Sequence, residues 1–301
     1  MKVNKILIIA GGLVKKLDDF IEPAKDLGLD VTLSSFYDIN FSSDEPSILR
    51  VGDQDLADFD VVYIRMVGKR LETATLLVNY LKEKNIKIVD SAYQTASLIP
   101  STISKAVELS KLIENNIPVP KTIFGRLSFL AKQGAKDFGF PFVIKVTEGR
   151  KARDVWAPRN QEELDGLLVS LYEREKKGES FFAQVFVEAS QRLRTLVING
   201  KVYGGITRPT KWRRRFIEKI NGEFPEGTKE SVKNIPADVL EVSLDAAKAV
   251  SLEIAGIDIL IEDKTDNKFI IEANAAPAWN LIKQDTGVEV EKEILNFLAN
   301  I

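Results

Sequence analysis

The chain has 301 residues, of which 45% are apolar and 29% charged, a composition typical of a globular protein with room for about two domains. Its 42 basic and 44 acidic residues give a net charge of −2, which argues against a general nucleic-acid or membrane-surface binder. Because cysteine and histidine are both absent, the sequence excludes disulfides, thiolate nucleophiles, Ser-His-Asp triads and metal sites built from those two residues.

The first 95 residues are predicted to form a parallel α/β layer. Short, continuous apolar runs indicate buried strands, and the helical segment after the first strand ends near Gly28, a natural C-cap. Gly11 and Gly12 lack the G-x-G-x-x-G spacing, so they do not predict a dinucleotide site. Strands that alternate with helices are typical of a doubly wound parallel sheet. The expected elements are strands at 5–10, 31–36, 60–66 and 86–91 and a Leu-rich helix at 71–83.

From Pro100 onward the pattern changes to longer helices and hairpins. A helix over 101–115, capped by Ser101, must end before Pro118. Asn199-Gly200 is the strongest short hairpin signal in the chain. Further strands are expected at 141–146, 183–189, 193–198, 201–207, 257–262 and 268–274, and further helices at 161–175, 237–254 and 289–300. No apolar run approaches the ~20 residues of a membrane span and the start lacks a signal-peptide pattern, so a cytoplasmic protein is expected.

The final hairpin carries the most informative polar residues. If residue 262 pairs with 268, antiparallel register places 260 opposite 270 and Asp258 opposite Glu272, with Asn274 on the same face. Two opposed carboxylates repel unless something positive lies between them. An Asp, a Glu and an amide oxygen suit Mg²⁺; a solvated face with a salt-bridging Lys or Arg is the alternative. The side chains expected on the buried face are Ile257, Ile259, Ile261, Phe269 and Ile271.

Lysines and arginines are the candidate anion ligands. Lys105 lies in the 101–115 helix, and Lys145 interrupts an apolar strand, where a lysine needs a partner such as a phosphate or a carboxylate. The basic runs 149–153 and 211–215 suit capture of phosphate or carboxylate, with solvated loops or a nucleic-acid contact as alternatives. Arg65 is predicted as a substrate contact, because ligands favour the C-terminal ends of strands in parallel sheets.

Several segments occur in a specific order: SKAVELSKLIENNIPVPKT, FGFPFVIKVTEG, AQVFVEA, RLRTLVINGKVYGGITR, AGIDIL, IEANAAP and TGVEVEKEIL. Through them, residues 96–301 resemble the ATP-grasp ligases, specifically the RimK-like ribosomal-protein glutamate ligases. The resemblance implies an α/β protein whose ATP-grasp part is α+β with antiparallel sheets. The implied domains are a parallel, doubly wound N-terminal domain at 1–95, a small lobe at 96–178 and a large lobe with the metal site at 179–301.

The resemblance also implies the chemistry. A carboxylate would attack ATP to give an acyl phosphate, which an amine would capture as an amide; glutamate joined to a peptide, a protein terminus or a small acid is one such pairing. ATP and Mg²⁺, or Mn²⁺, would be required, and a homo-oligomer is compatible with the family. Arg208 would be catalytic, and the metal ligands would be Asp258, Glu272 and Asn274. ATP would contact Lys105, Lys145, Gln184, Val185, Phe186, Val187, Arg192 and Arg213. The substrates would contact Arg65, Arg194, Trp212 and Arg215.

The sequence departs from the family pattern at several positions. The family's Gly-rich loop reads EGRKARD here, with only Gly149 kept. Arg192 replaces an acidic nucleotide contact, Arg215 replaces an asparagine and Ala278 a glycine. These changes keep two other hypotheses open: a degenerate ATP-grasp module that binds nucleotide or an acidic ligand without turnover, and an ATP-grasp kinase of a polyanionic small molecule.

Overall fold

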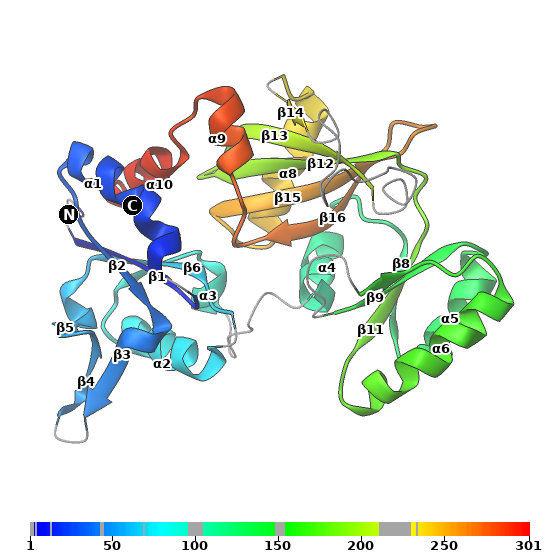
Figure 1. Cartoon of the computed structure of the whole chain (residues 1–301), viewed down its shortest axis with the longest axis horizontal. Coiled ribbons are helices and arrows are strands. Elements are labelled where there is room, and N and C mark those ends of the chain that lie inside the picture. The colour runs from blue at the N-terminus through cyan, green and yellow to red at the C-terminus, as the bar shows by residue number, and fades with distance from the viewer. Residues whose placement is uncertain are drawn as a thin grey trace, which may run out of the picture.

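The structure is a computed structural model and describes residues 3, 5–12, 14–42, 45–68, 70–95, 105–147, 154–210, 230–232 and 234–301. Its N-terminal part is a parallel sheet with the strand order β2-β1-β6-β7, which confirms the predicted layer (Figure 1). Ile6 and Ile8 of β1 pack on one face with the C-terminal helix, while Leu7 and Ile9 pack on the other with α2. Both faces are thus covered, which explains the continuous apolar run. The bounds are β1 Lys5–Ala10, β2 Asp30–Ser35, β6 Val61–Met66, β7 Lys87–Val89, α1 Ile21–Leu27, α2 Leu71–Glu83 and α3 Ala92–Thr95, with a 3₁₀ helix over Val14–Phe20.

The segment that connects β2 to β6 in the sequence forms a small antiparallel sheet, which the sequence did not predict. It consists of β3 Ile39–Ser42, β4 Glu45–Val51 and β5 Gln54–Asp55, in the order β3-β4-β5. Leu49 and Val51 are buried with the core beneath the parallel sheet. β3 has only four residues and β5 only two, and the β3–β4 register is irregular, so their alternation is hard to detect in the sequence.

Close packing at the end of β1 leaves no room for a side chain at Gly11. Its N–H donates to the Met66 carbonyl at 2.6 Å, and an added Cβ would lie 2.1 Å from the Val67 carbonyl oxygen. Gly11→Ala is therefore expected to destabilise the protein by about 1–3 kcal/mol or more, because backbone must move. Chemical denaturation checks this, with Gly12→Ala as the control, since the nearest atom to a Cβ there is a Met66 side-chain carbon at 4.0 Å. Equal stability of the two variants would contradict the packing argument.

The second sheet is antiparallel, with the order β10-β9-β11-β8 and with α5 and α6 packed on one face (green in Figure 1). The strand expected at 183–189 was placed too late in the chain. The observed β11 starts at the buried Phe181 and ends at Val185, after which the chain leaves the sheet. The bounds are β8 Thr122–Gly125, β9 Phe142–Val146, β10 Val155–Trp156, β11 Phe181–Val185, α5 Leu127–Asp137 and α6 Gln161–Lys176.

The third sheet has the order β14-β13-β12-β15-β16 and is antiparallel throughout. Asn199 and Gly200 connect β12 to β13 with φ values of 45° and 71°, which confirms the predicted hairpin. The helix expected at 237–254 was too long: α8 ends at Ala249, because Ser251 has a φ of 59° and β15 begins at Ile254. The bounds are β12 Gln191–Ile198, β13 Lys201–Pro209, β14 Glu230–Val232, α8 Ala237–Ala249, β15 Ile254–Ile261 and β16 Lys268–Asn274.

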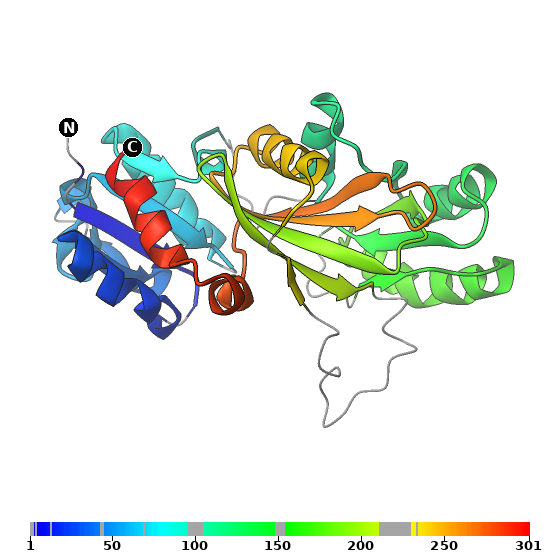
Figure 2. The same ribbon diagram turned by 90° about the horizontal axis from the view of Figure 1, so that it is seen from above.

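Three further helices join the sheets. In α4 (Lys105–Glu114), Leu112 packs in the core formed by α8 and the third sheet. After β16 come α9 (Asn280–Thr286) and α10 (Val290–Ala299), and α10 packs on α1 of the N-terminal layer (Figure 2). The division at residues 95 and 178 stays a prediction; in the observed sheets, β11 pairs with β8 and β9, and α4 packs on the third sheet.

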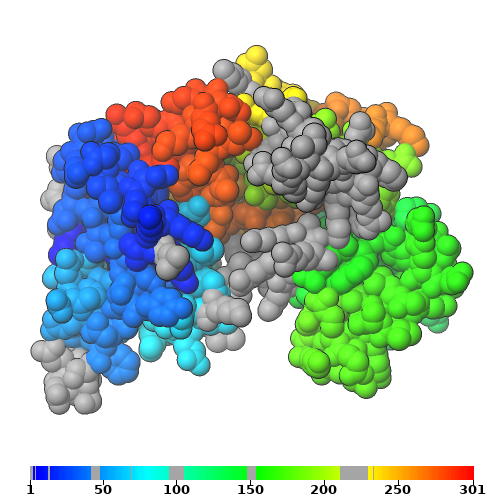
Figure 3. Space-filling model, viewed as in Figure 1, coloured from blue at the N-terminus to red at the C-terminus, as the bar shows by residue number. Residues whose placement is uncertain are grey.

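The second sheet with its helices lies at the opposite end of the molecule from the N-terminal layer (Figure 1). Figure 3 shows the second sheet and its helices (green) standing apart from the N-terminal layer (blue and cyan) on the viewed face. Within the described residues, the helices all fall short of the length and apolarity that a membrane crossing needs.

Candidate active site

A cavity of about 630 Å³ lies between the second and third sheets. Apolar side chains from both sheets line it, including Val143 of β9 and Leu260 of β15. It brings together the following predicted residues: Lys105, Lys145, Gln184, Val185, Phe186, Val187, Arg192, Arg194, Arg208, Glu272 and Asn274. The candidates Trp212, Arg213 and Arg215 and the basic runs 149–153 and 211–215 lie outside the described residues.

The β15–β16 hairpin places Asp258 opposite Glu272, as predicted, but by a different register. At the loop end Ile261 pairs with Lys268 and Ile259 with Ile270, one position away from the expected pairing. An irregularity beside Asp258 then restores the pairing of Asp258 with Glu272.

This irregularity is a β-bulge, and it changes which side chains of β16 are buried. Ile270 is fully buried in the core, whereas Ile271 lines the cavity and Phe269 is only half-buried. The extra residue shifts the alternation by one position, which turns Ile271 to the side of Glu272. The three isoleucines of β15 that were predicted to be buried, Ile257, Ile259 and Ile261, face the core, although Ile261 is only partly buried.

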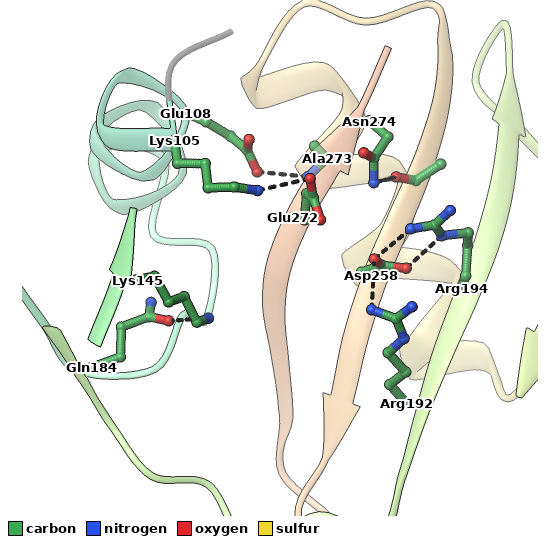
Figure 4. A network of polar contacts seen from close by, with 11 residues as sticks. Lys105, Glu108, Lys145, Gln184, Arg192, Arg194, Asp258, Glu272, Ala273 and Asn274 are labelled. Atoms are coloured by element: carbon green, nitrogen blue, oxygen red, sulfur yellow. Dashed lines mark hydrogen bonds and ion pairs between the residues drawn. The ribbon is translucent and has the colours of Figure 1, made fainter. Parts of the chain in front are cut away.

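Asp258 is completely buried and binds arginine. Both of its carboxylate oxygens accept hydrogen bonds from Arg194, from Nε and Nη2 at 2.6 Å each, and Nη1 of Arg192 lies 3.5 Å away (Figure 4). Burial raises the pKa of Asp258, but the hydrogen bonds and charge of Arg194 outweigh burial and leave the pKa below its ordinary value. Asp258 is therefore an ionised carboxylate held in a bidentate pair.

Lys105 connects α4 to the metal candidate Glu272. Its Nζ lies 2.7 Å from Glu272 Oε1, and both side chains are partly buried (Figure 4). Burial lowers the pKa of Lys105, but the charges of Glu272 and Glu108 outweigh it, so the pKa lies above its ordinary value. The lysine is thus a fixed positive charge at one wall of the cavity.

Glu108 is a functional candidate that sequence reasoning missed. It is 4% exposed, and its Oε1 accepts a hydrogen bond from the Ala273 N–H at 2.6 Å, between the two candidate ligands Glu272 and Asn274. Burial raises its pKa to about 8. Helical spacing could have identified Glu108 in the sequence, because it lies one turn after Lys105 on the face that carries Leu112.

Lys145 and Gln184 form a second polar contact on the wall of the cavity that the second sheet provides. Lys145 Nζ donates to Gln184 Oε1 at 2.6 Å, and Gln184 Nε2 donates to Thr122 Oγ1 at 2.9 Å. Burial, followed by repulsion from Lys105, lowers the pKa of Lys145 to about 8. An anion in the cavity would be the natural partner of this ammonium group.

Arg65 lies apart from the residues that line the cavity. Its Nη2 donates to the Pro277 carbonyl at 2.6 Å, and its guanidinium carbon is 4.4 Å from the centre of a Trp279 ring. It thereby contacts the segment that follows β16, in which Ala276 and Ala278 line the cavity. Asp154, at the end of the EGRKARD segment, also lines the cavity and pairs with Arg174 at 2.9 Å.

The oxygen donors in the cavity suit a hard divalent cation. The Glu272 carboxylate and the Asn274 side chain both line it from β16, and Asn274 Nδ2 is turned to the Gly256 carbonyl at 3.4 Å. Mg²⁺ binds a few protein oxygens and completes its shell with phosphates and water. Glu272 and Asn274 therefore fit such an ion, whereas Asp258 faces Arg194.

Comparison with known proteins identifies the family. Residues 102–298 match the RimK-like ATP-grasp domain, so the chain belongs to that family. A probable alpha-L-glutamate ligase of Syntrophotalea carbinolica is 25% identical over 86% of this chain and 82% of that protein. One of Shewanella halifaxensis is 24% identical over 84% of the chain, which spans only 53% of that relative.

The fold is shared with solved ligases. The structure of the ATP-grasp ligase PsnB complexed with a phosphomimetic variant of its minimal precursor, Mg and ADP matches with a TM-score of 0.70 at 16% identity, covering 100% of this chain and 99% of that one. This likeness confirms the predicted fold class: an N-terminal parallel layer followed by an ATP-grasp part with antiparallel sheets.

Proposed function

We propose that the chain is an ATP- and Mg²⁺-dependent carboxylate–amine ligase that acts through an acyl phosphate. The observation that carries this proposal is the meeting, in one cavity, of Lys105 and Lys145 from one side, Glu272 and Asn274 from β16, and arginines from β12 and β13. The similarity to probable alpha-L-glutamate ligases and to the ATP-grasp ligase PsnB, solved with a precursor, Mg and ADP, supports it.

We assign the predicted site residues to the nucleotide, the cation and the substrates. Lys105 and Lys145 hold the ATP phosphates, and the end of β11 with the residues after it, Gln184 to Val187, lines the adenine. Arg192 and Arg213 are the further nucleotide contacts. Bound Mg²⁺, held by Glu272 and Asn274, neutralises charge on the phosphates. We assign the substrates to Arg65, Arg194, Trp212 and Arg215.

The reaction needs positioning and positive charge more than a covalent protein group. A carboxylate oxygen of the acid attacks the γ-phosphorus, and the bond to ADP breaks. The amine then attacks the acyl carbon, inorganic phosphate leaves with its electron pair, and the amine loses a proton to solvent. We assign to Arg208, which lines the cavity, the stabilisation of the transferring phosphoryl group.

Glutamate with a peptide, protein terminus or small acid is the substrate class that we propose first. Hydroxylamine tests it, because it captures an acyl phosphate as a hydroxamate without the natural amine. With glutamate, a peptide or a small acid as the carboxylate, together with ATP and Mg²⁺, we expect the hydroxamate of the acid that the site activates and an equivalent amount of ADP. Phosphorylated acid that resists hydroxylamine would instead indicate a kinase, and nucleotide binding without ADP release from any acid would indicate a binding module.

The depressed pKa of Lys145 predicts a pH dependence of nucleotide affinity. Below pH 8 the ammonium form predominates and binds phosphate; as pH rises through about 8 that form is lost from the free protein. The affinity for AMPPNP should therefore fall by up to about tenfold per pH unit above 8, with proton uptake on binding. Calorimetry in buffers of different ionisation enthalpy measures both effects. Lys145→Gln should abolish the pH dependence, and the exposed α5 variant Lys136→Gln should preserve it.

A further inference from the structure

Asp258 and Glu272 lie directly opposite each other on adjacent strands, yet they differ in burial and in their partners. Asp258 is fully buried and does not contribute to the cavity wall, whereas Glu272 lines the cavity with a side chain that is 32% exposed. Both oxygens of Asp258 are engaged by Arg194, and one oxygen of Glu272 is engaged by Lys105. The two carboxylates therefore differ in their access to a cation.

Arginines surround Asp258 on neighbouring strands. Arg194 pairs with Asp258 across β12 and β15, and Arg192 lies directly opposite Arg208 across β12 and β13. All three guanidinium groups act on the Asp258 carboxylate, and the four residues together carry a net charge of +2. This arginine cluster has the charge of one divalent cation and lines the cavity through its three arginines.

A metal ion at Asp258 would have to displace Arg194 from a buried bidentate pair. It would then lie beside Arg192 and Arg208, whose charges repel it. A cation at Glu272 and Asn274 meets a smaller obstacle, because Lys105 engages only one oxygen of Glu272 and both side chains face the cavity, where phosphate oxygens can complete its coordination.

We infer that this chain binds a single divalent cation with its nucleotide, at Glu272 and Asn274, and that Asp258 is not a metal ligand. Asp258 is instead the counter-ion that fixes Arg194 in the cavity wall, where the arginine cluster supplies the positive charge of a second cation. The inference rests on the proposed function, since it presumes that a metal–nucleotide complex binds in the cavity.

Mn²⁺ and AMPPNP provide the test, because electron paramagnetic resonance reports free Mn²⁺ without any need for turnover. Titration of the wild-type chain at saturating AMPPNP is expected to give one bound Mn²⁺ per chain. Two bound ions would overturn the single-cation inference and leave the proposed function intact. AMPPNP binding with no bound Mn²⁺, or no AMPPNP binding, would overturn both.

The isosteric variants Glu272→Gln and Asp258→Asn form a matched pair across the two strands. The affinity for Mn²⁺ should fall by more than about tenfold in Glu272→Gln and by less than that in Asp258→Asn. An equal loss in the two variants would contradict the assignment of Asp258. Circular dichroism confirms folding first, and where Asp258→Asn fails to fold, the wild-type stoichiometry decides the question.

Discussion

Glu272→Gln is expected to lower the rate of ADP release by about 10²–10³-fold while the fold is retained. The change keeps the size of the side chain but removes the charge that would bind the cation. Its stability cost should be small, because the Glu272 side chain is 32% exposed and water screens the ion pair with Lys105 that the change removes. The measurement is kcat for ADP release with the best acid and amine, alongside the free energy of unfolding.

Glu241→Gln is the matched control for that experiment. Glu241 is exposed on α8, outside the cavity, so both its activity and its stability should equal those of the wild type. Undiminished activity of Glu272→Gln would show that the cation site lies elsewhere.

Asp258→Asn is expected to reduce the free energy of unfolding by about 3–5 kcal/mol, far more than Glu272→Gln. The substitution leaves the guanidinium of Arg194 without its carboxylate in a buried position, with Arg192 and Arg208 nearby. Urea denaturation at pH 7 measures the loss. The surface pair Asp238–Lys268 is the control, since Asp238→Asn should change stability little.

The same variant has a defined pH signature. Because the folded pKa of Asp258 lies below its unfolded value, the carboxylate contributes its full stability above about pH 4 and loses it as pH falls through the folded pKa. The stability difference between wild type and Asp258→Asn should therefore shrink at acidic pH. A variant as stable as the wild type at pH 7 would show that the Arg194 pair contributes nothing to the fold.

Most of the architecture could be predicted from local patterns. The strand at 5–10 is buried on both faces and therefore has the continuous apolar run that indicates a parallel strand. The Asn199–Gly200 dipeptide predicts its hairpin because both residues readily adopt the positive φ values that the turn requires. The β3–β5 sheet was not predicted because β3 and β5 have only four and two residues and the β3–β4 register is irregular.

The residues of the candidate site could be predicted from the sequence, but most of the contacts between them could not. Lys105, Glu272 and Asn274 belong to recognisable sequence motifs, and the structure brings all three to one cavity. The pairing of Asp258 with Arg194 depends on the register between β12 and β15, which joins strands about 60 residues apart and leaves no local signal. The bulge that turns Ile271 into the cavity is likewise a property of strand pairing.

The most direct test of the ligase proposal follows oxygen from the acid. The acid that gives a hydroxamate, whether glutamate, a peptide or a small acid, is labelled with ¹⁸O in its carboxyl groups and incubated with the chain, ATP, Mg²⁺ and the amine, and the inorganic phosphate is analysed by mass spectrometry. Attack of the carboxylate on ATP followed by amide formation predicts a single labelled oxygen in each phosphate released. Phosphate that is released with ADP but carries no label would contradict an acyl-phosphate ligase.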